Sequence, residues 1–459
     1  METLLALALF LQSSPRDRLS DAIRDARLNA AQAALTDMAA GGGAGAARGL
    51  IVSFPKVRDR IQSLHLGVLR TRADYDRIET GITITQEEEK QKERDLENAL
   101  KRVQEASNVA ISGEKIYDAL RASFATLPPE SVPVLVAEIE QTKSWILKCE
   151  LIEGLGTLKA QDALLGLLEK EKESLYLSVI LSGITGDRAI PYLSHSQWQV
   201  RMAALKACSR TRDGVGPIID QLQVLDARWR NQAFPALDAL VGTKLPPDPI
   251  AWRDWWKANR DDWVANRYLP ERPKVLPAAG RTTFYDVPIT STRICFVIDR
   301  SRSMKEQDRF TTAKTELKKL IGELPDEARI NIVMFGETAA SFSKGTRPLD
   351  RRGRRDAEYF IDKADYEEGT NLYLALEKAL SFVGSADAGL LREDGPDSIL
   401  VLSDGESTCG KVVNEELVAR VVARRARYLM PIIHTVSIAR NAKSLQLMAE
   451  MNGGEHRSK

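Results

Sequence analysis

The sequence predicts a helical N-terminal part followed by a doubly wound α/β domain. Helical patterns, Ala-rich at first, run from Asp17 to about residue 243. Apolar runs such as Ile294–Ile298 and Ser398–Ser403 then alternate with helical patterns, which is typical of buried parallel strands joined by right-handed crossovers. The chain has 459 residues, of which 43% are hydrophobic. That is enough for about two to four domains.

The expected α/β domain covers residues 291–459. Besides the two apolar runs, its elements are the helices Phe310–Leu324, Leu372–Phe382, Glu415–Tyr428 and Ala442–Met451 and the strands Arg329–Phe335 and Ile432–Ile438. A Pro-rich, extended segment precedes the domain, and Phe284–Ile289 is expected to be an edge strand that leads into it. Sheets of this kind bind ligands beyond the carboxyl ends of their strands.

Oxygen-bearing side chains follow the buried strands of this domain at the ligand-binding edge. Asp299 comes directly after Ile294–Ile298, with Ser301 and Ser303 behind it, and Asp404 closes Ser398–Ser403. Thr370 opens a helix after Glu368-Gly369, which turns its hydroxyl toward the same crevice. Because Mg²⁺ prefers oxygen ligands and keeps much of its water, these residues predict a site for Mg²⁺ or Mn²⁺.

Three short stretches, FVIDRSRSM, EGTNL and VLSDGE, resemble the metal-ion-dependent adhesion site of von Willebrand factor A domains. The resemblance implies that the hydroxyls of Ser301, Ser303 and Thr370 ligate Mg²⁺ or Mn²⁺, while Asp299 and Asp404 bind largely through water. The resemblance also implies a role in adhesion, without catalytic turnover. An Asp or Glu carboxylate from a protein partner would complete the coordination shell.

One position departs from the pattern of this family. Arg302 stands between the two serines, where the family usually has Gly, and Arg300 lies two residues before it. Alternation with the ligand positions favours guanidinium groups that point outward, where they could pair with an acidic ligand. The alternative is a loop that keeps its shape and has lost its affinity for metal.

Residues 15–128 are expected to be helical. Gly41–Gly45 marks a linker or tight bend, and the charged helix 85–107 begins in a Thr85-x-x-Glu88 capping box. The short apolar seam of that helix leaves two interpretations open, a coiled-coil dimer or a solvated helix packed on its neighbour.

Residues 129–243 show an internal repeat of helix pairs. Longer helices begin near Trp145, Leu175, Trp198 and Trp229, and shorter ones precede them at Val132–Ile139, Ala163–Leu168, Ala189–Leu193 and Val215–Leu222. The spacing resembles short HEAT-like repeats of an alpha-solenoid, with an irregular bundle as the alternative. In residues 244–290, Trp252, Trp255, Trp256 and Trp263 share one helix face that seals the last repeat. This order of parts resembles bacterial proteins with HEAT-like repeats and a von Willebrand factor A domain.

The remaining features bound compartment and partners. Leu4–Leu11, within residues 1–14, has the apolar character of a signal peptide. Met1-Glu2-Thr3 lacks the usual positive charge, so periplasmic or extracellular export and a cytoplasmic location both stay open. No transmembrane segment is expected. A net charge of +1 argues against a nucleic-acid partner, and the four scattered cysteines imply no disulfide framework.

Three function classes follow from these patterns. The first is a non-enzymatic adaptor that binds a partner carboxylate through the metal ion. The second is a metal-independent scaffold that binds partners through the repeats. The third, a hydrolase of the Asp-x-Asp type, is disfavoured because position 301 is Ser and the four histidines, His65, His195, His434 and His456, are dispersed. We therefore expect no enzyme activity, and the oligomeric state is open.

Overall fold

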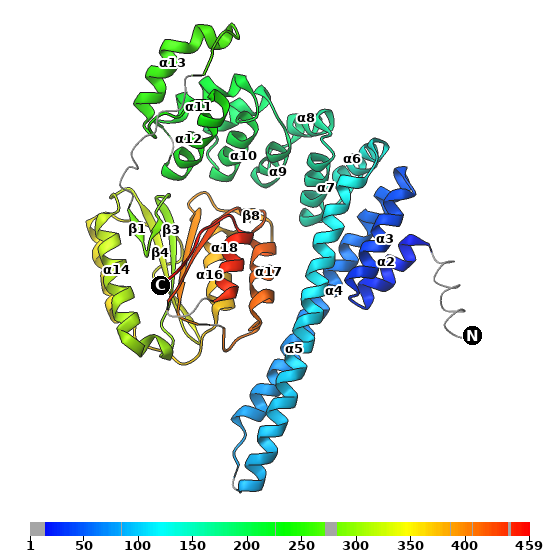
Figure 1. Cartoon of the computed structure of the whole chain (residues 1–459), viewed down its shortest axis with the longest axis vertical. Coiled ribbons are helices and arrows are strands. Elements are labelled where there is room, and N and C mark those ends of the chain that lie inside the picture. The colour runs from blue at the N-terminus through cyan, green and yellow to red at the C-terminus, as the bar shows by residue number, and fades with distance from the viewer. Residues whose placement is uncertain are drawn as a thin grey trace. The chain divides into compact units, whose positions relative to one another are not determined.

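The computed structural model describes residues 14–83, 85–224, 226–270, 282–385, 387–405, 407–438 and 442–459 (Figure 1). The apolar stretch Leu4–Leu11 and most of the Pro-rich segment therefore lie outside the described residues. The chain divides into two compact units, one of residues up to 160 with 407–422, and one of residues 161–406 with 423–459.

The first unit is helical apart from its short connections. Its N-terminal helices are α2 (Pro15–Arg24), α3 (Leu28–Ala40), α4 (Gly43–Thr80) and α5 (Gln86–Ala122). Gly42 and Gly43 have φ of 71° and 63°, so the glycine run forms the tight bend between α3 and α4. The capping box is confirmed, because the amide of Glu88 donates to Thr85 Oγ1 and the Thr85 amide donates to Glu88 Oε2.

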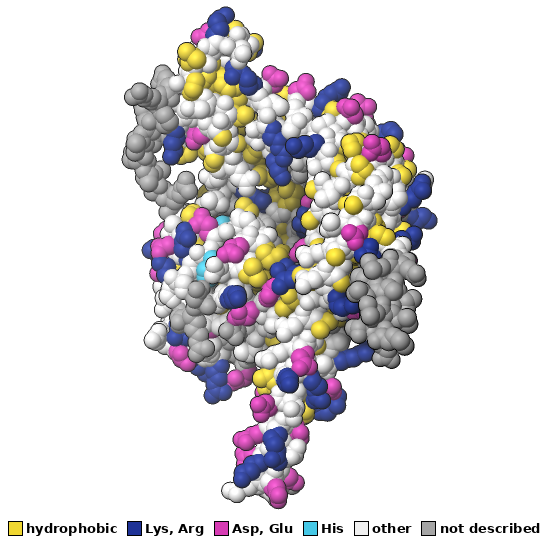
Figure 2. All heavy atoms as spheres, turned by 45° about the vertical axis from the view of Figure 1, so that its right-hand side comes forward, with side chains coloured by type: hydrophobic (Ala, Val, Ile, Leu, Met, Phe, Trp, Pro, Cys, Tyr) yellow, Lys and Arg dark blue, Asp and Glu magenta, His cyan; other side chains and the backbone are white. Residues whose placement is uncertain are grey.

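Helices α4 and α5 form a long antiparallel pair (Figure 1). The charged helix continues to Ala122, further than residue 107, because its later part buries side chains such as Ile111, Ile116 and Leu120. Lys, Arg, Asp and Glu side chains are interspersed where the pair ends in its connecting loop (Figure 2). The structure therefore shows a helix packed on its neighbour, with a solvated charged end.

The predicted helix pairs of residues 129–243 are all present. The first pair belongs to the first unit, which also contains the 3₁₀ turns Ser123–Thr126 and Pro129–Ser131, and the other three pairs belong to the second unit. The longer helices are α7 (Trp145–Thr157), α9 (Ser174–Gly183), α10 (Trp198–Cys208) and α12 (Ala227–Val241). The shorter ones are α6 (Val132–Gln141), α8 (Gln161–Lys170), the 3₁₀ helix η3 (Asp187–Ser194) and α11 (Val215–Gln221), with a 3₁₀ turn at Arg212–Gly214. Their identity as HEAT-like repeats stays a prediction.

The tryptophan-rich helix α13 (Pro249–Val264) packs on α11. Trp252 and Trp263 are buried, and Trp255 meets both rings edge-on with centroids 5.8 and 6.2 Å away. Trp256 lies so close to Gly216 of α11 that a Cβ there would come within 2.7 Å of the indole ring. The tryptophans therefore cover the last helix pair, as predicted.

The C-terminal domain is built on a mostly parallel sheet with the strand order β11-β10-β9-β3-β4-β5. These strands are β3 (Arg293–Asp299), β4 (Arg329–Phe335), β5 (Ala339–Ser341), β9 (Ser398–Ser403), β10 (Ile432–Ser437) and β11 (His456–Ser458). Strand β3 lies between β4 and β9 and is parallel to both, whereas β5 and the short β6 (Arg347–Pro348) are antiparallel to β4. A separate pair consists of β7 (Gly384–Ser385) and β8 (Leu390–Leu391).

Helices cover both faces of this sheet (Figure 1). They are α14 (Arg309–Glu323), α15 (Arg351–Lys363), α16 (Leu372–Val383) and α18 (Lys443–Met451), and a 3₁₀ segment η5 (Arg302–Asp308) follows β3. Helix α17 (Glu415–Ala426) begins in the first unit and ends in the second. Phe310, Leu317 and Ile361 of α14 and α15 pack with Phe296 and Ile332 of the central strands in one buried cluster. The predicted doubly wound fold is therefore present, and β3 ends at the middle of the sheet.

The expected edge strand over Phe284–Ile289 is wrong. The segment folds back on itself as a hairpin of β1 (Thr283–Phe284) and β2 (Val287–Pro288), outside the main sheet. Tyr285 and Asp286 both have left-handed φ, 48° and 62°, which is the geometry of a tight two-residue hairpin turn. The turn lets both Phe284 and Val287 reach the buried cluster beside α14.

Within the second unit, α12 joins the helical part to the α/β domain through a buried arginine. The guanidinium of Arg228 donates to the carbonyl oxygens of Asp397 and Met430, the latter at 2.9 Å, just before strands β9 and β10 begin. The Cζ atom of Arg228 lies 4.6 Å from the centroid of the Trp198 ring. Burial lowers the pKa of Arg228. This contact is at the end of the strands opposite to Asp299.

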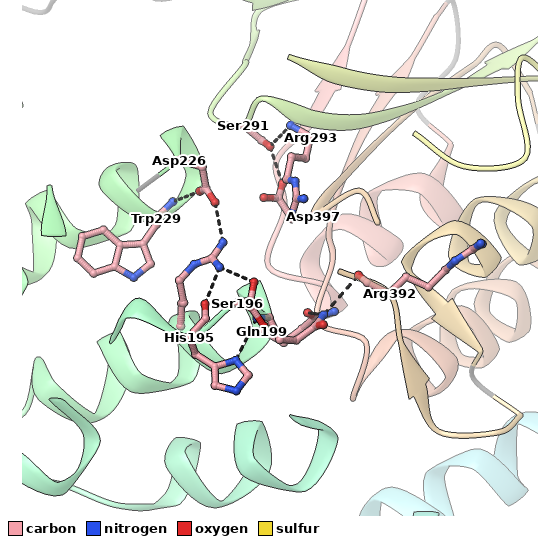
Figure 3. A network of polar contacts seen from close by, with 11 residues as sticks. His195, Ser196, Gln199, Asp226, Trp229, Ser291, Arg293, Arg392 and Asp397 are labelled. Atoms are coloured by element: carbon pink, nitrogen blue, oxygen red, sulfur yellow. Dashed lines mark hydrogen bonds and ion pairs between the residues drawn. The ribbon is translucent and has the colours of Figure 1, made fainter. Parts of the chain in front are cut away.

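Two glutamines and a carboxyl group extend this contact. The side-chain NH₂ group of Gln197 donates to the backbone carbonyl of Arg392 at 3.3 Å. That of Gln199 donates to the backbone carbonyl of Leu429 at 3.2 Å. Figure 3 shows Asp397 nearby, where its carboxylate accepts a hydrogen bond from the hydroxyl of Ser291. Burial raises the pKa of Asp397 to about 6, although the charge of Arg228 opposes this shift.

Replacing Asp397 by Asn is expected to change how stability depends on pH. The unfolded carboxyl has a pKa near 4, so between about pH 4 and 6 the folded chain binds a proton that the unfolded chain has released. The free energy of unfolding therefore falls as pH rises through this window, by on the order of 2 to 3 kcal/mol for this residue. Asp397→Asn removes that fall. In urea unfolding, the free energy of unfolding of the variant relative to the native chain should therefore rise between about pH 4 and 7. If this difference in free energy stays constant over the range, the raised pKa of Asp397 is contradicted.

None of the helices in the described ranges combines the length and the apolar character needed to cross a bilayer.

Candidate metal centre

Asp299 is the last residue of β3 and lies completely buried at the carboxyl end of the sheet. Its Oδ1 accepts a hydrogen bond of 2.7 Å from the amide of Ser301, and its Oδ2 accepts one from the hydroxyl of Ser403 at the end of β9. Burial raises the pKa of Asp299 to about 6, against the opposing effect of these hydrogen bonds. The carboxylate is therefore fixed in position by two neighbouring strand ends.

The two serines and Asp404 continue from this point as a chain of polar contacts. Ser301 Oγ and Ser303 Oγ are 3.1 Å apart, and Ser303 Oγ donates to Asp404 Oδ1 at 2.8 Å. Ser301 and Asp404 are buried, whereas Ser303 is exposed. The structure thus brings Asp299, Ser301, Ser303 and Asp404 together, with an opening to solvent at Ser303.

Thr370 lies on a loop that is attached to the serine segment through the backbone. The amide of Glu367 donates to the carbonyl of Arg300 at 2.9 Å, and Ser301 forms an isolated parallel bridge with Glu367. Thr370 itself is buried.

The helix after Gly369 begins later than predicted, because Asn371 is its N-cap and Leu372 its first residue. Asn371 caps α16, because its side chain accepts from the amide of Leu374 at 3.2 Å. Gly369, with φ of 67°, makes the turn just before Thr370. Asn371 supplies the side-chain oxygen that a helix N-terminus requires.

Both arginines of the serine segment turn away from the ligand oxygens. Arg302 Nη1 pairs with Glu368 Oε1 at 2.7 Å, and both side chains are about 70% exposed, at 71% and 69%. Arg300 Nη2 pairs with Glu367 Oε2 at 2.9 Å. Arg302 therefore points outward as predicted, whereas the Arg300 side chain is only 16% exposed, and each arginine already has an acidic partner within the domain.

A third arginine at the site was not found from the sequence. Arg309 Nη1 lies 3.2 Å from Asp404 Oδ2 and 3.4 Å from Glu306 Oε2. Its side chain is only 12% exposed. Arg309 belongs to none of the three motif stretches. It is the first residue of the helix that follows the serine segment, and nothing in the sequence marks it as part of the site.

The donor atoms suit a hard cation. In the described part of the chain, no group of three or more His, Cys, Asp or Glu side chains could hold a metal ion. The candidate set instead offers three hydroxyls and two carboxylates, all of them oxygen donors. Mg²⁺ and Mn²⁺ favour such ligands, whereas the sulfur and imidazole donors of typical zinc sites are missing from this set.

The family model of the von Willebrand factor type A domain matches residues 294–458. These residues form a von Willebrand factor type A domain. We refer to this part of the chain as the VWA domain from here on.

Similar proteins share only part of their length with this chain. Inter-alpha-trypsin inhibitor heavy chain H2 of Mus musculus is 28% identical over 120 residues, which is 26% of this chain and 13% of the heavy chain. The same protein of Mesocricetus auratus matches equally. The similarity therefore spans about an eighth of these relatives.

Two solved structures with a similar fold are a von Willebrand factor type A protein from Catenulispora acidiphila and a mussel protein. The first is 19% identical with a TM-score of 0.31, over 38% of this chain and 40% of that chain. The second is proximal thread matrix protein 1 from the mussel byssus with a zinc-occupied MIDAS motif, the abbreviation for metal-ion-dependent adhesion site. It is 17% identical with a TM-score of 0.29, over 36% of this chain and 40% of that chain.

Proposed function

We propose that the chain is a non-enzymatic protein-binding adaptor whose VWA domain holds Mg²⁺ or Mn²⁺. The hydroxyls of Ser301, Ser303 and Thr370 bind the ion directly, and Asp299 and Asp404 hold its water ligands. When bound, the ion supplies an open coordination position that accepts a carboxylate. The partner is therefore a protein that presents an Asp or Glu side chain.

The observation that supports this proposal most directly is the continuous contact from Asp299 through Ser301 and Ser303 to Asp404. It joins the ends of β3 and β9, so the oxygens are positioned by two buried strands of the sheet. Ser303 is exposed at the end of this series. An incoming carboxylate can approach the site there without any change in the core.

The orientation of the two loop arginines also favours a working site. A guanidinium directed at the ligand oxygens would repel a divalent cation. The ion pairs Arg302–Glu368 and Arg300–Glu367 instead direct both groups toward neighbouring carboxylates. These pairs weigh against the alternative that Arg302 has abolished metal affinity.

The role of Thr370 provides the test of the proposal. Thr370→Val keeps the shape of the buried side chain and removes the hydroxyl, so it should weaken Mn²⁺ binding at least about tenfold. Thr370→Ser keeps the hydroxyl and should bind Mn²⁺ as the native chain does. The measurement is a Mn²⁺ titration of the full chain followed by electron paramagnetic resonance.

The same titration also tests the carboxylate. Acetate added at constant ionic strength should tighten Mn²⁺ binding to the native chain, because it supplies the missing ligand. Equal Mn²⁺ affinities for the Val and Ser variants would rule out Thr370 as a ligand. Absence of Mn²⁺ binding by the native chain, with or without acetate, would rule out the whole proposal.

The second candidate, a metal-independent scaffold, would bind its partner through the helical pairs. Part of that surface is already engaged within the chain. Gln197, Gln199 and Arg228 all donate to backbone carbonyls of the VWA domain. This engagement favours the metal centre as the partner-binding site.

A further inference from the structure

Arg309 is an unusual neighbour for a divalent-cation site. Its guanidinium contacts Asp404 Oδ2 at 3.2 Å, which is the carboxylate oxygen that does not accept from Ser303. The Asp404 side chain is 1% exposed and that of Arg309 is 12% exposed. The Nε of Arg309 is buried and makes no hydrogen bond with the described residues. A permanent positive charge therefore lies against one of the proposed ligand carboxylates.

The backbone just before Arg309, which brings its side chain to Asp404, has an energetically unfavourable conformation. Gln307 and Asp308 have consecutive left-handed φ values of 53° and 54°, which residues other than glycine rarely adopt. Arg309 is then the first residue of α14, and no side chain caps this helix. A cation at a helix N-terminus is unfavourable because the helix dipole is positive there. The contact with Asp404 is the favourable interaction that offsets these features.

A second carboxylate offers the guanidinium another position. The same Nη1 atom lies 3.4 Å from Glu306 Oε2, and the Glu306 side chain is 70% exposed. Arg309 is thus shared between a buried carboxylate at the site and an exposed carboxylate at the surface. Moving toward Glu306 would keep the guanidinium paired and would free Asp404.

We propose that Arg309 sets the cation affinity of this site by competing with the metal ion for Asp404. The inference rests on the proposed function, since it concerns the same metal centre. A divalent ion that Asp404 holds through water shares this carboxylate with Arg309, unless the guanidinium moves toward Glu306. Repulsion between the two cations lowers the affinity by at least about tenfold.

The test compares Mn²⁺ affinities of full-length variants in electron paramagnetic resonance titrations. Arg309→Gln should bind Mn²⁺ about tenfold more tightly than the native chain, because the competing charge is gone. Arg309→Lys keeps the charge and should stay within about threefold of the native affinity. Glu306→Gln removes the alternative partner and should weaken Mn²⁺ binding by about twofold or more.

Arg302→Gln is the matched control. It removes an equal charge from the same segment, but Arg302 pairs with Glu368 and is 71% exposed. Its Mn²⁺ affinity should stay within about twofold of the native value, because solvent screens an exposed charge. If Arg302→Gln tightens binding as much as Arg309→Gln does, general charge is responsible and the role of Arg309 is refuted.

The remaining outcomes separate this inference from the proposed function. Native binding that Arg309→Gln leaves unchanged refutes competition by Arg309 and leaves the metal centre standing. Binding by Arg309→Gln and not by the native chain refutes the proposed function of the native chain, although it supports competition by Arg309. Absence of Mn²⁺ binding by every variant refutes both. Circular dichroism spectra that match the native chain establish that each variant is folded.

Discussion

Replacing Asp299 by Asn is expected to reduce Mg²⁺ and Mn²⁺ affinity by about 100-fold while the VWA domain stays folded. Asn has no charge with which to orient the water ligands of the ion. Its carbonyl oxygen can still accept from the amide of Ser301, and its NH₂ group can donate to the Ser403 hydroxyl. The local hydrogen bonds therefore survive the substitution, and the cation site does not. Isothermal titration calorimetry with Mn²⁺ measures the loss.

A matched control for this prediction is Asp326→Asn. Asp326 pairs with Arg354 and is 80% exposed, so the variant loses the same charge in the same domain. We expect it to bind Mn²⁺ like the native chain. Similar losses in the two variants would mean that net charge, and no specific site, governs the binding.

Replacing Arg228 by Ala is expected to lower the free energy of unfolding by about 3 kcal/mol. The substitution leaves the carbonyl oxygens of Asp397 and Met430 without their buried donor. It also removes the cation beside the buried Asp397 carboxyl and the stacking on Trp198. Urea unfolding followed by tryptophan fluorescence measures the change.

Two further variants show whether this effect is specific. Arg228→Lys keeps the charge but lacks the planar guanidinium that reaches both carbonyls. Its free energy of unfolding should therefore lie between those of the native chain and the Ala variant. Arg253→Ala, on the exposed face of α13, should change the stability by less than about 0.5 kcal/mol. Equal losses for Arg228→Ala and Arg253→Ala would contradict a structural role for the buried contact.

The sequence predicts the α/β domain well because its elements have strong local patterns. The strand Arg329–Phe335 has the predicted bounds, and β3 ends at Asp299 as its apolar run indicates. Asp299 and Asp404 could be placed together because parallel strands end at one edge of the sheet. The same rule predicts that Ser301 and Ser303 lie close to these two carboxylates.

Features that depend on unusual backbone conformations escaped prediction. Arg309 reaches Asp404 only because Gln307 and Asp308 adopt left-handed conformations, and neither is glycine. The hairpin at Tyr285–Asp286 depends on the same conformation in two residues. Residue type alone gives little indication of such positions, because the surrounding packing imposes them.

Contacts between distant segments escaped prediction for another reason. Arg228 lies on a helix whose pattern indicates only which face is apolar. Its hydrogen-bond acceptors are backbone carbonyls of residues 397 and 430, which carry no signal in the side-chain sequence. The contact becomes visible only once the helical pairs and the VWA domain are folded together.

The measurement that tests the central claim most directly is thermal unfolding of the full chain with and without Mg²⁺, beside Asp299→Asn. Ligand at about 100 times its dissociation constant stabilises a folded domain by about 2.7 kcal/mol. For the VWA domain, this predicts a rise of roughly 5 to 10 °C in its unfolding transition, and no rise in the variant. An equal shift in both proteins, or none in the native chain at saturating Mg²⁺, would contradict a cation site at Asp299.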